Sequence, residues 1–309
     1  MEIDSDNDEL FHAKDWIGRG DSGERARIQQ IVKIPENFAK QCLPQSSLSV
    51  TELVSFKLPR VSSEFISTKV ISWFSTDEPT IDYSILTTRP IPSREFLSKL
   101  NDAAGQAWLN GAKSIVDHRF NDGTDRLPLW TVTFWMEVAR CEEICSHWKD
   151  GVSWLERQES KAKRKGNTLP ETIKQACELL ESLPWDQQMP YCNGMTSTAQ
   201  LSKFLGTYWL SDDHINMMVE ELCAEMESDV KLKDSKTKVA NLAFTMEISK
   251  VHEKLAYSDS QKKKTLLWKY QKMVEEGTLD RLYFPLHINA CHWIAAMIDF
   301  KRRTFLSGI

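Results

Sequence analysis

The chain has 309 residues, with 39 basic against 44 acidic side chains and a formal net charge of -5. Hydrophobic residues make up 41% and charged residues 27%, which is typical of a soluble globular protein. The absence of an uncharged apolar run of about 18 residues excludes a transmembrane helix. The acidic balance argues against nucleic acid as a partner.

The beginning of the chain and its cysteines indicate the compartment. Met1-Glu2-Ile3-Asp4 is acidic and has no apolar segment after it, so it is not a secretory signal. We therefore expect an intracellular protein, in the nucleus or cytoplasm, whose seven scattered cysteines stay reduced.

The first third of the chain contains no motif with a clear chemistry. Residues 1–24 are predicted to be an acidic disordered tail, and residues 25–125 form a mixed region of unknown role. Residues 50–61 and 64–74 are rich in β-branched and aromatic side chains, which predicts short strands. A proline-punctuated loop then leads into a predicted helix over residues 94–107.

Residues 126–195 are predicted to be a Trp-rich helical segment followed by a linker. Apolar side chains recur at three- and four-residue steps up to about Ser160, so they share one face of a long helix. They are Trp130, Phe134, Val138, Cys141, Cys145 and Trp148. Pro170 opens a second helix over residues 171–183. Residues 185–194 contain Pro190 and Gly194 and mark the expected domain boundary.

Residues 196–309 predict a partial sheet flanked by helices, which makes the fold class α+β. Asp212 and Asp213 mark a helix start, and a core-facing stripe is expected after them, formed by Ile215, Met218, Val219 and Leu222. Residues 261–276 predict a second helix. Two β-rich runs, 281–284 and 293–300, are expected to pair in a central sheet.

Metal and anion sites are not predicted. Cys141 and Cys145 lie one helical turn apart, but His147 falls on a different face and no second ligand pair exists. Buried cysteines among tryptophans are the favoured interpretation, and no cofactor is expected. The short basic runs 161–165, 262–264 and 301–303 are interpreted as solvated helix ends or turns.

His292 differs from the other histidines because of its surroundings. It opens a β-type run, is followed by the bulky Trp293, and is preceded by Pro285 and Asn289. A histidine placed so can serve as a general base, although a structural role stays open from the pattern alone. The remaining histidines are interpreted as ordinary surface or core groups: His12, His118, His147, His214, His252 and His287.

Two blocks of sequence resemble one family. Residues 282–304, Leu-Tyr-Phe-Pro-Leu-His-Ile-Asn-Ala-Cys-His-Trp and onward, are similar to the segment that carries the catalytic histidine in the Ulp1/SENP cysteine proteases. Residues 208–216, Tyr-Trp-Leu-Ser-Asp-Asp-His-Ile-Asn, resemble the first helix of the same domain. The blocks occur in the family's order, so the resemblance covers about residues 200–309.

The resemblance implies a papain-like cysteine protease domain that cleaves after the C-terminal Gly-Gly of SUMO or another ubiquitin-like protein. His292 corresponds to the catalytic histidine. Trp209 and Trp293 correspond to two indoles that enclose the diglycine tail, a tunnel that suits glycine because it has no Cβ. The implied partner is therefore the tail of a ubiquitin-like protein, without a membrane, metal or cofactor.

The same resemblance predicts a truncated domain. The family's aspartate is expected 17 residues after His292, at Ile309, the last residue of the sequence, and the oxyanion glutamine and nucleophilic cysteine would lie further on. Cys291, Cys223 and Cys192 have no matching context. We therefore expect a peptidase by descent that is inactive as this chain, and whether it is an enzyme stays open. The alternatives are a non-catalytic module that binds ubiquitin-like proteins and a transposon-associated interaction protein.

Overall fold

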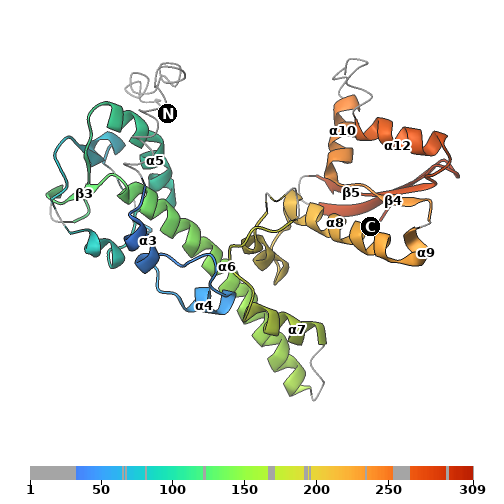
Figure 1. The fold of residues 1–309 in the computed structure, drawn as a ribbon, viewed down its shortest axis with the longest axis horizontal. Helices are drawn as coiled ribbons and strands as arrows, with labels where there is room; N and C mark the ends of the chain where they lie inside the picture. Colours follow the sequence, from blue (N-terminus) through green and yellow to red (C-terminus); the bar gives the residue numbers. More distant parts are fainter. Residues whose placement is uncertain are drawn as a thin grey trace. The chain divides into compact units, whose positions relative to one another are not determined.

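The computed structural model describes residues 33–64, 66, 68–80, 82–120, 123–165, 171–190, 194, 196–233, 235–252, 265–289 and 292–308. The chain divides between Trp185 and Asp186 into two compact units, called unit 1 and unit 2 (Figure 1). Each unit combines helices with a sheet, which confirms the α+β class. The predicted acidic tail lies outside the described residues. No helix in the described part of the chain could cross a bilayer.

Unit 1 packs helices around a small antiparallel sheet with the strand order β1-β2-β3. Its core combines side chains of the mixed region 25–125 with side chains of the Trp-rich segment that follows it. Examples are Trp73 and Leu97 from the first, and Phe134 and Trp135 from the second. The elements are α3 (Glu36–Cys42), α4 (Val50–Ser55), η2 (Val70–Trp73), β1 (Phe74–Ser75), η3 (Tyr83–Thr87), α5 (Arg94–Leu109), β2 (Ser114–Val116), β3 (Arg126–Pro128), α6 (Thr131–Arg164) and α7 (Glu171–Leu180).

The prediction of strands over residues 50–61 and 64–74 is wrong. Residues 50–55 form α4, because Ser49 and Glu52 make a capping box in which each side chain accepts a bond from the other's backbone N–H. That cap supplies acceptors for two backbone N–H groups that would otherwise be unpaired, and so it outweighs the β-preference of the valines. In the second stretch residues 70–73 form the short helix η2, and β1 begins only at the last residue of the stretch, Phe74.

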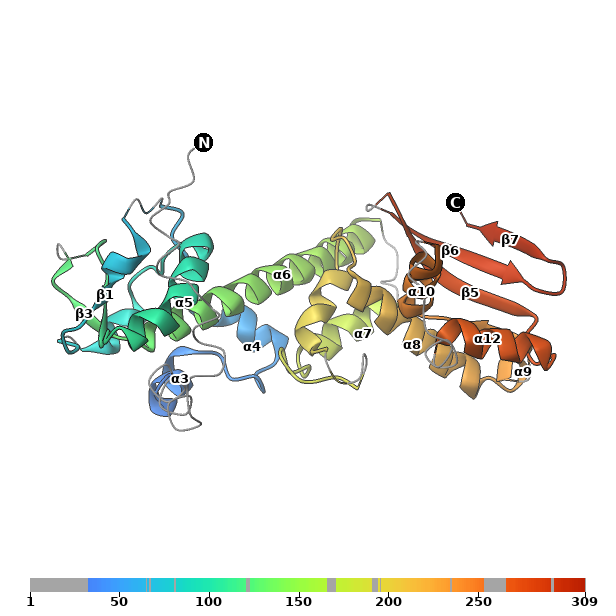
Figure 2. The ribbon, with the colours of Figure 1, turned by 90° about the horizontal axis from the view of Figure 1, so that it is seen from above.

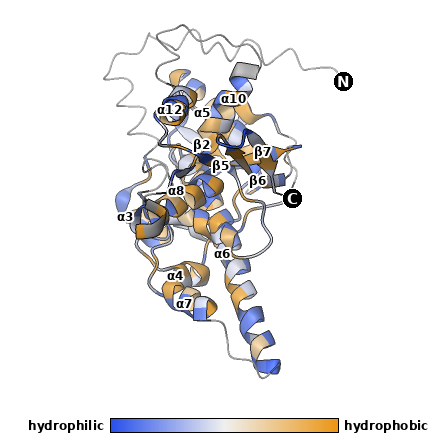
Figure 3. Ribbon diagram, turned by 90° about the vertical axis from the view of Figure 1, so that its right-hand side faces the viewer, coloured by the Kyte–Doolittle hydropathy of each residue, from blue (hydrophilic) through white to orange (hydrophobic). Residues whose placement is uncertain are grey.

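The predicted long helix is confirmed as α6, and its predicted apolar face is buried. Cys141 and Cys145 are both buried, and the Cys145 thiol donates to the carbonyl oxygen of Leu53 in α4 at 3.5 Å. The C-terminal end of α6 is hydrophilic (Figure 3), with Lys161, Lys163 and Arg164 in its last turn. Basic side chains there complement the negative end of the helix dipole.

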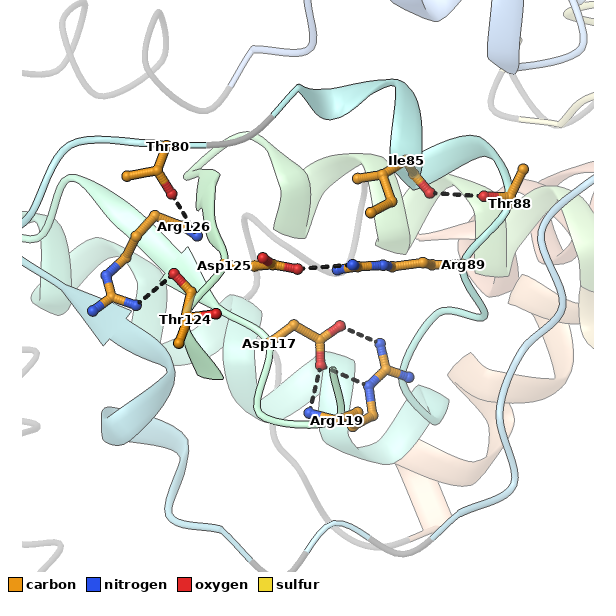
Figure 4. A network of polar contacts seen from close by, with 9 residues as sticks. All are labelled: Thr80, Ile85, Thr88, Arg89, Asp117, Arg119, Thr124, Asp125 and Arg126. Atoms are coloured by element: carbon orange, nitrogen blue, oxygen red, sulfur yellow. Dashed lines mark hydrogen bonds and ion pairs between the residues drawn. The ribbon is translucent and has the colours of Figure 1, made fainter. Parts of the chain in front are cut away.

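A polar network stabilises the connection between β2 and β3 (Figure 4). Asp117 is fully buried directly after β2, and its carboxylate accepts bonds of 2.9 and 2.7 Å from the guanidinium of Arg119. Asp125, just before β3, pairs with Arg89 at 2.7 Å. The guanidinium groups of both arginines lie over the ring of Phe120. The two buried acids therefore fix both ends of this connection.

Unit 2 is built on a sheet of order β4-β5-β6-β7, in which β4 is parallel to β5 and the other pairs are antiparallel. The predicted pairing of 281–284 with 293–300 is confirmed, and Figure 2 shows β5, β6 and β7 side by side. The elements are η6 (Thr198–Phe204), α8 (Asp212–Ser228), α9 (Val230–Lys233), β4 (Thr237–Val239), α10 (Leu242–His252), α12 (Leu266–Glu275), β5 (Arg281–Ile288), β6 (His292–Asp299) and β7 (Thr304–Ser307).

Alternation along the strands gives the sheet of unit 2 two different faces. Leu282, Phe284 and Ala296 are buried on the face that α10 and α12 cover, where Phe244 contacts Phe284. Figure 1 shows α8 on the opposite side of β4 and β5. Side chains at the alternate positions, such as Tyr283, line a groove between the sheet and α8.

The predicted core stripe of α8 is only half buried. Ile215 and Val219 are each 9% exposed, but Met218 is 51% and Leu222 44% exposed. The two exposed side chains line the groove against the sheet, which has a volume of about 660 Å³ and mainly apolar walls. Helical periodicity correctly places all four on one side, but it cannot tell a filled core from an open groove.

Candidate active site

The hairpin of β5 and β6 places His292 at the first position of β6, opposite Ile288. Asn289, directly after β5, has a φ of 52°. This left-handed conformation starts the turn between the strands, and asparagine adopts it more readily than most residues. The side chain of His292 is exposed, so it is accessible from solvent.

Trp293 is fixed by two contacts. Its indole nitrogen donates a hydrogen bond of 2.9 Å to the carbonyl oxygen of Leu210. Its ring stacks on the imidazole of His287, with 4.2 Å between the ring centroids and 14° between the ring planes. Trp293 also lines the groove between α8 and the sheet.

Trp209 precedes Leu210 and is 71% exposed. The bond between Leu210 and Trp293 therefore joins the segment of Trp209 to the start of β6. The sequence predicts all three site residues in one place, and the structure brings the segments of Trp209, His292 and Trp293 together through this one contact.

His214 stabilises the beginning of α8, immediately after that segment. Its imidazole is fully buried, with Nδ1 3.2 Å from the backbone nitrogen of Ser211 and Nε2 3.0 Å from the carbonyl oxygen of Gln200. A backbone N–H can only donate and a carbonyl can only accept, so the proton is on Nε2 and the ring is neutral. Burial lowers the pKa of His214, which favours this neutral form.

Cys223 is the cysteine of unit 2 within the described residues, and it is not arranged as a nucleophile. Its thiol donates to the carbonyl oxygen of Val239 in β4. Burial raises the pKa of Cys223, so the unreactive thiol form dominates at neutral pH. Cys192 and Cys291 lie outside the described residues.

Asp299, at the end of β6, has a structural role. It is buried and accepts a bond of 2.8 Å from the backbone N–H of Arg302 and one of 3.3 Å from Arg281. The Arg302 amide, followed by the Arg281 guanidinium, lowers the pKa of Asp299. This carboxylate closes the turn into β7, at the opposite end of β6 from His292.

Metal ligation finds no support in the described part of the chain. No group of three or more histidine, cysteine, aspartate or glutamate side chains there could hold an ion. Cys141 and Cys145 in particular are packed in the interior of unit 1.

His287 is the residue that the sequence interpretation missed. It was expected to be an ordinary histidine, and it proves to be the stacking partner of Trp293. Its position becomes informative only once the register of the hairpin is known, because residues equally far from the centre of the turn face each other across the two strands.

Comparison with known families supports the resemblance found in the sequence. Residues 208–307 match the family described as the Ulp1 protease family, C-terminal catalytic domain. The matched segment runs from just before Trp209 to the end of β7, and so includes His292 and Trp293. Comparisons with curated proteins and with solved structures give no match. Unit 2 is thus similar, over residues 208–307, to the catalytic domain of the Ulp1 protease family.

Proposed function

We propose that unit 2 binds the C-terminal Gly-Gly tail of SUMO or another ubiquitin-like protein and descends from a cysteine-type peptidase. The observation that carries the proposal is the hydrogen bond from Trp293 to Leu210. It joins the exposed Trp209 to the strand that begins with His292. Two indoles at such a site suit a tail without Cβ atoms, because only glycine passes between closely spaced rings.

The proposed role of His292 is that of the family's general base. In such a peptidase the histidine takes the proton of a cysteine thiol, and the thiolate attacks the carbonyl carbon of the second glycine. The C–N bond after that glycine breaks, the histidine returns the proton to the leaving amine, and water then hydrolyses the thioester. An aspartate orients the imidazole, and oxyanion donors stabilise the tetrahedral intermediate. Of these parts, His292 is the one that we assign to a described residue.

We propose further that the 309-residue chain holds the tail without cutting it. Support comes from Cys223, whose thiol is bonded to Val239 and protonated at neutral pH. Catalytic groups of this kind act as a unit, so loss of the nucleophile alone removes nearly all of the acceleration. The domain responsible is proposed to begin at about residue 196.

The test combines binding and turnover. A fluorescent peptide with the tail sequence of SUMO should bind the wild-type chain, and the same peptide ending in Ala-Ala should not. Trp209→Ala and Trp293→Ala should each weaken binding, whereas Trp268→Ala, which removes another exposed indole of unit 2, should not. Equal effects of all three substitutions, or binding of the Ala-Ala peptide, would contradict the tail site.

Turnover is measured with a fluorogenic Gly-Gly substrate, with and without a thiol-alkylating reagent. We expect none. Turnover that is lost both on alkylation and in His292→Ala would identify a working thiol, and Cys291→Ser would then show whether it is Cys291. Such a result would support the peptidase ancestry and overturn the proposal of binding alone.

We propose an intracellular location, in the nucleus or cytoplasm. None of the five cysteines in the described part of the chain is in a disulfide, which suits a reducing compartment. The proposed partner is a ubiquitin-like protein, and neither a membrane nor nucleic acid is needed for its recognition.

A second candidate function is an interaction role of unit 1, as in a transposon-associated protein. One observation favours it: the exposed basic side chains Lys161, Lys163 and Arg164 in the last turn of α6. If they bind nucleic acid, the affinity of the whole chain for duplex DNA should fall steeply with salt. A triple substitution of these residues by glutamine should then abolish binding without affecting the tail peptide.

A further inference from the structure

His287 and Trp293 are direct cross-strand partners in the hairpin of β5 and β6. Partners of this kind point to the same face of a sheet and lie close enough for their side chains to touch. Here the imidazole and the indole lie nearly parallel, 14° apart, with centroids separated by 4.2 Å. The arrangement is therefore a nearly parallel stack of the two rings.

The indole of Trp293 is constrained in two complementary ways. The stack on His287 sets the plane of the ring, and the hydrogen bond from its nitrogen to Leu210 sets the rotation of the ring within that plane. The hydrogen bond alone would still allow the ring to tilt about the N–H···O direction. A stacked partner removes that freedom.

We propose that His287 is a positioning residue of the tail site, which holds the indole of Trp293 in the orientation that receives a Gly-Gly tail. This inference rests on the function proposed above. His287 acts through Trp293 and touches neither the substrate nor a reacting atom. Its stacking surface is what matters, so another flat ring at position 287 should replace it.

The position of the indole can be measured directly. The chain contains 11 tryptophans, so it is labelled with 5-fluorotryptophan, and the ¹⁹F resonance of Trp293 is assigned as the one lost in Trp293→Phe. In His287→Ala this resonance should shift and broaden, because the indole loses the ring current and the restraint of its neighbour. In His287→Phe it should stay sharp.

Binding of the SUMO tail peptide is measured on the same variants. His287→Ala should weaken binding roughly three- to tenfold, the size expected for loss of one stacked pair. His287→Phe should restore most of the affinity. The control is Trp268→Ala, which removes an exposed ring of unit 2 on α12 and leaves the hairpin of β5 and β6 intact.

The results separate this inference from the proposed function. An unchanged Trp293 resonance in His287→Ala, or full affinity of that variant for the peptide, would overturn the positioning role while the tail site stands. Failure of His287→Phe to restore binding would also count against it. If the wild-type chain binds no peptide although the Trp293 resonance responds to His287→Ala, the proposed function fails, and the tail-receiving part of the inference fails with it.

Discussion

The indole nitrogen of Trp293 donates a 2.9 Å hydrogen bond to the carbonyl oxygen of Leu210, a residue 83 positions earlier in the chain. The bond connects the segment before α8 with the start of β6. It is a long-range contact between the two sequence blocks that resemble the Ulp1 family. Its removal should therefore disturb both blocks at once.

Trp293→Phe removes this bond and keeps a ring for stacking. The free energy of unfolding of unit 2 should fall by about 1–2 kcal/mol, because the half-buried carbonyl of Leu210 loses its donor. Hydrogen exchange followed by mass spectrometry should show faster exchange over residues 208–216. Trp268→Phe, on α12, is the control and should leave this segment unchanged. Identical exchange in both variants would contradict the proposed link.

His214 should make the stability of unit 2 dependent on pH. Its pKa is lower in the folded chain than its ordinary value of 6.5, chiefly through burial, so the unfolded state takes up the proton more readily. The free energy of unfolding should therefore decrease as the pH falls below about 6.5, and the stabilisation should be fully present above that value.

The measurement is urea denaturation from pH 8 to pH 5, compared with His214→Gln. This variant should be less stable at pH 8 and should lose less stability on acidification, because it has no proton to bind at this position. An equal slope in the two proteins would assign the pH dependence to other groups.

The ion pair of Asp117 with Arg119 should be essential for unit 1. Asp117→Asn keeps the volume but leaves a guanidinium that is almost fully buried without its counter-charge. We expect a loss of about 3–5 kcal/mol in the free energy of unfolding of unit 1. Glu95→Gln removes an exposed ion pair with Lys99 and should change stability little. Similar unfolding midpoints for the two variants would contradict this.

β7 should limit the solubility of the chain. It is the last strand in the described sheet, and Phe305 and Leu306 are each 57% exposed. An exposed apolar strand at a sheet edge favours association. Leu306→Lys should therefore raise the concentration at which light scattering first detects oligomers. Thr304→Lys adds the same charge on the same face without removing apolar surface, and should have a smaller effect.

The helices and strands with a clear period could be predicted from the sequence. The buried face of α6 and the pairing of β5 with β6 follow from spacing alone, because periods of 3.6 and 2 decide which side chains share a face. The helix α4 does not follow from periodicity, because the signal for it is the capping box of Ser49 and Glu52. The valines of the same stretch favour a strand.

The site could be predicted only in part. The resemblance to the family identifies His292, Trp209 and Trp293 as site residues. It says which residue types stand at which positions, but it gives no distances or orientations. The stack of His287 depends on the register of the hairpin, and the register depends on a turn whose length the sequence does not specify. The exposure of Met218 depends on what lies across the groove, which is a property of the tertiary fold and not of α8 itself.

Pro285 determines how this sheet can be extended. β4 pairs with β5 only as far as Tyr283, and two residues later Pro285 offers no N–H, while its carbonyl accepts a 2.9 Å bond from the hydroxyl of Thr245 in α10. A further strand therefore cannot continue along this side of β5 beyond β4. In the described part of unit 2, the long edge open to strand addition is β7. If two chains pair through β7 in a two-fold arrangement, the β7 edge of each chain is covered by the other. Association by this route should therefore end at a dimer and should not continue into a fibre.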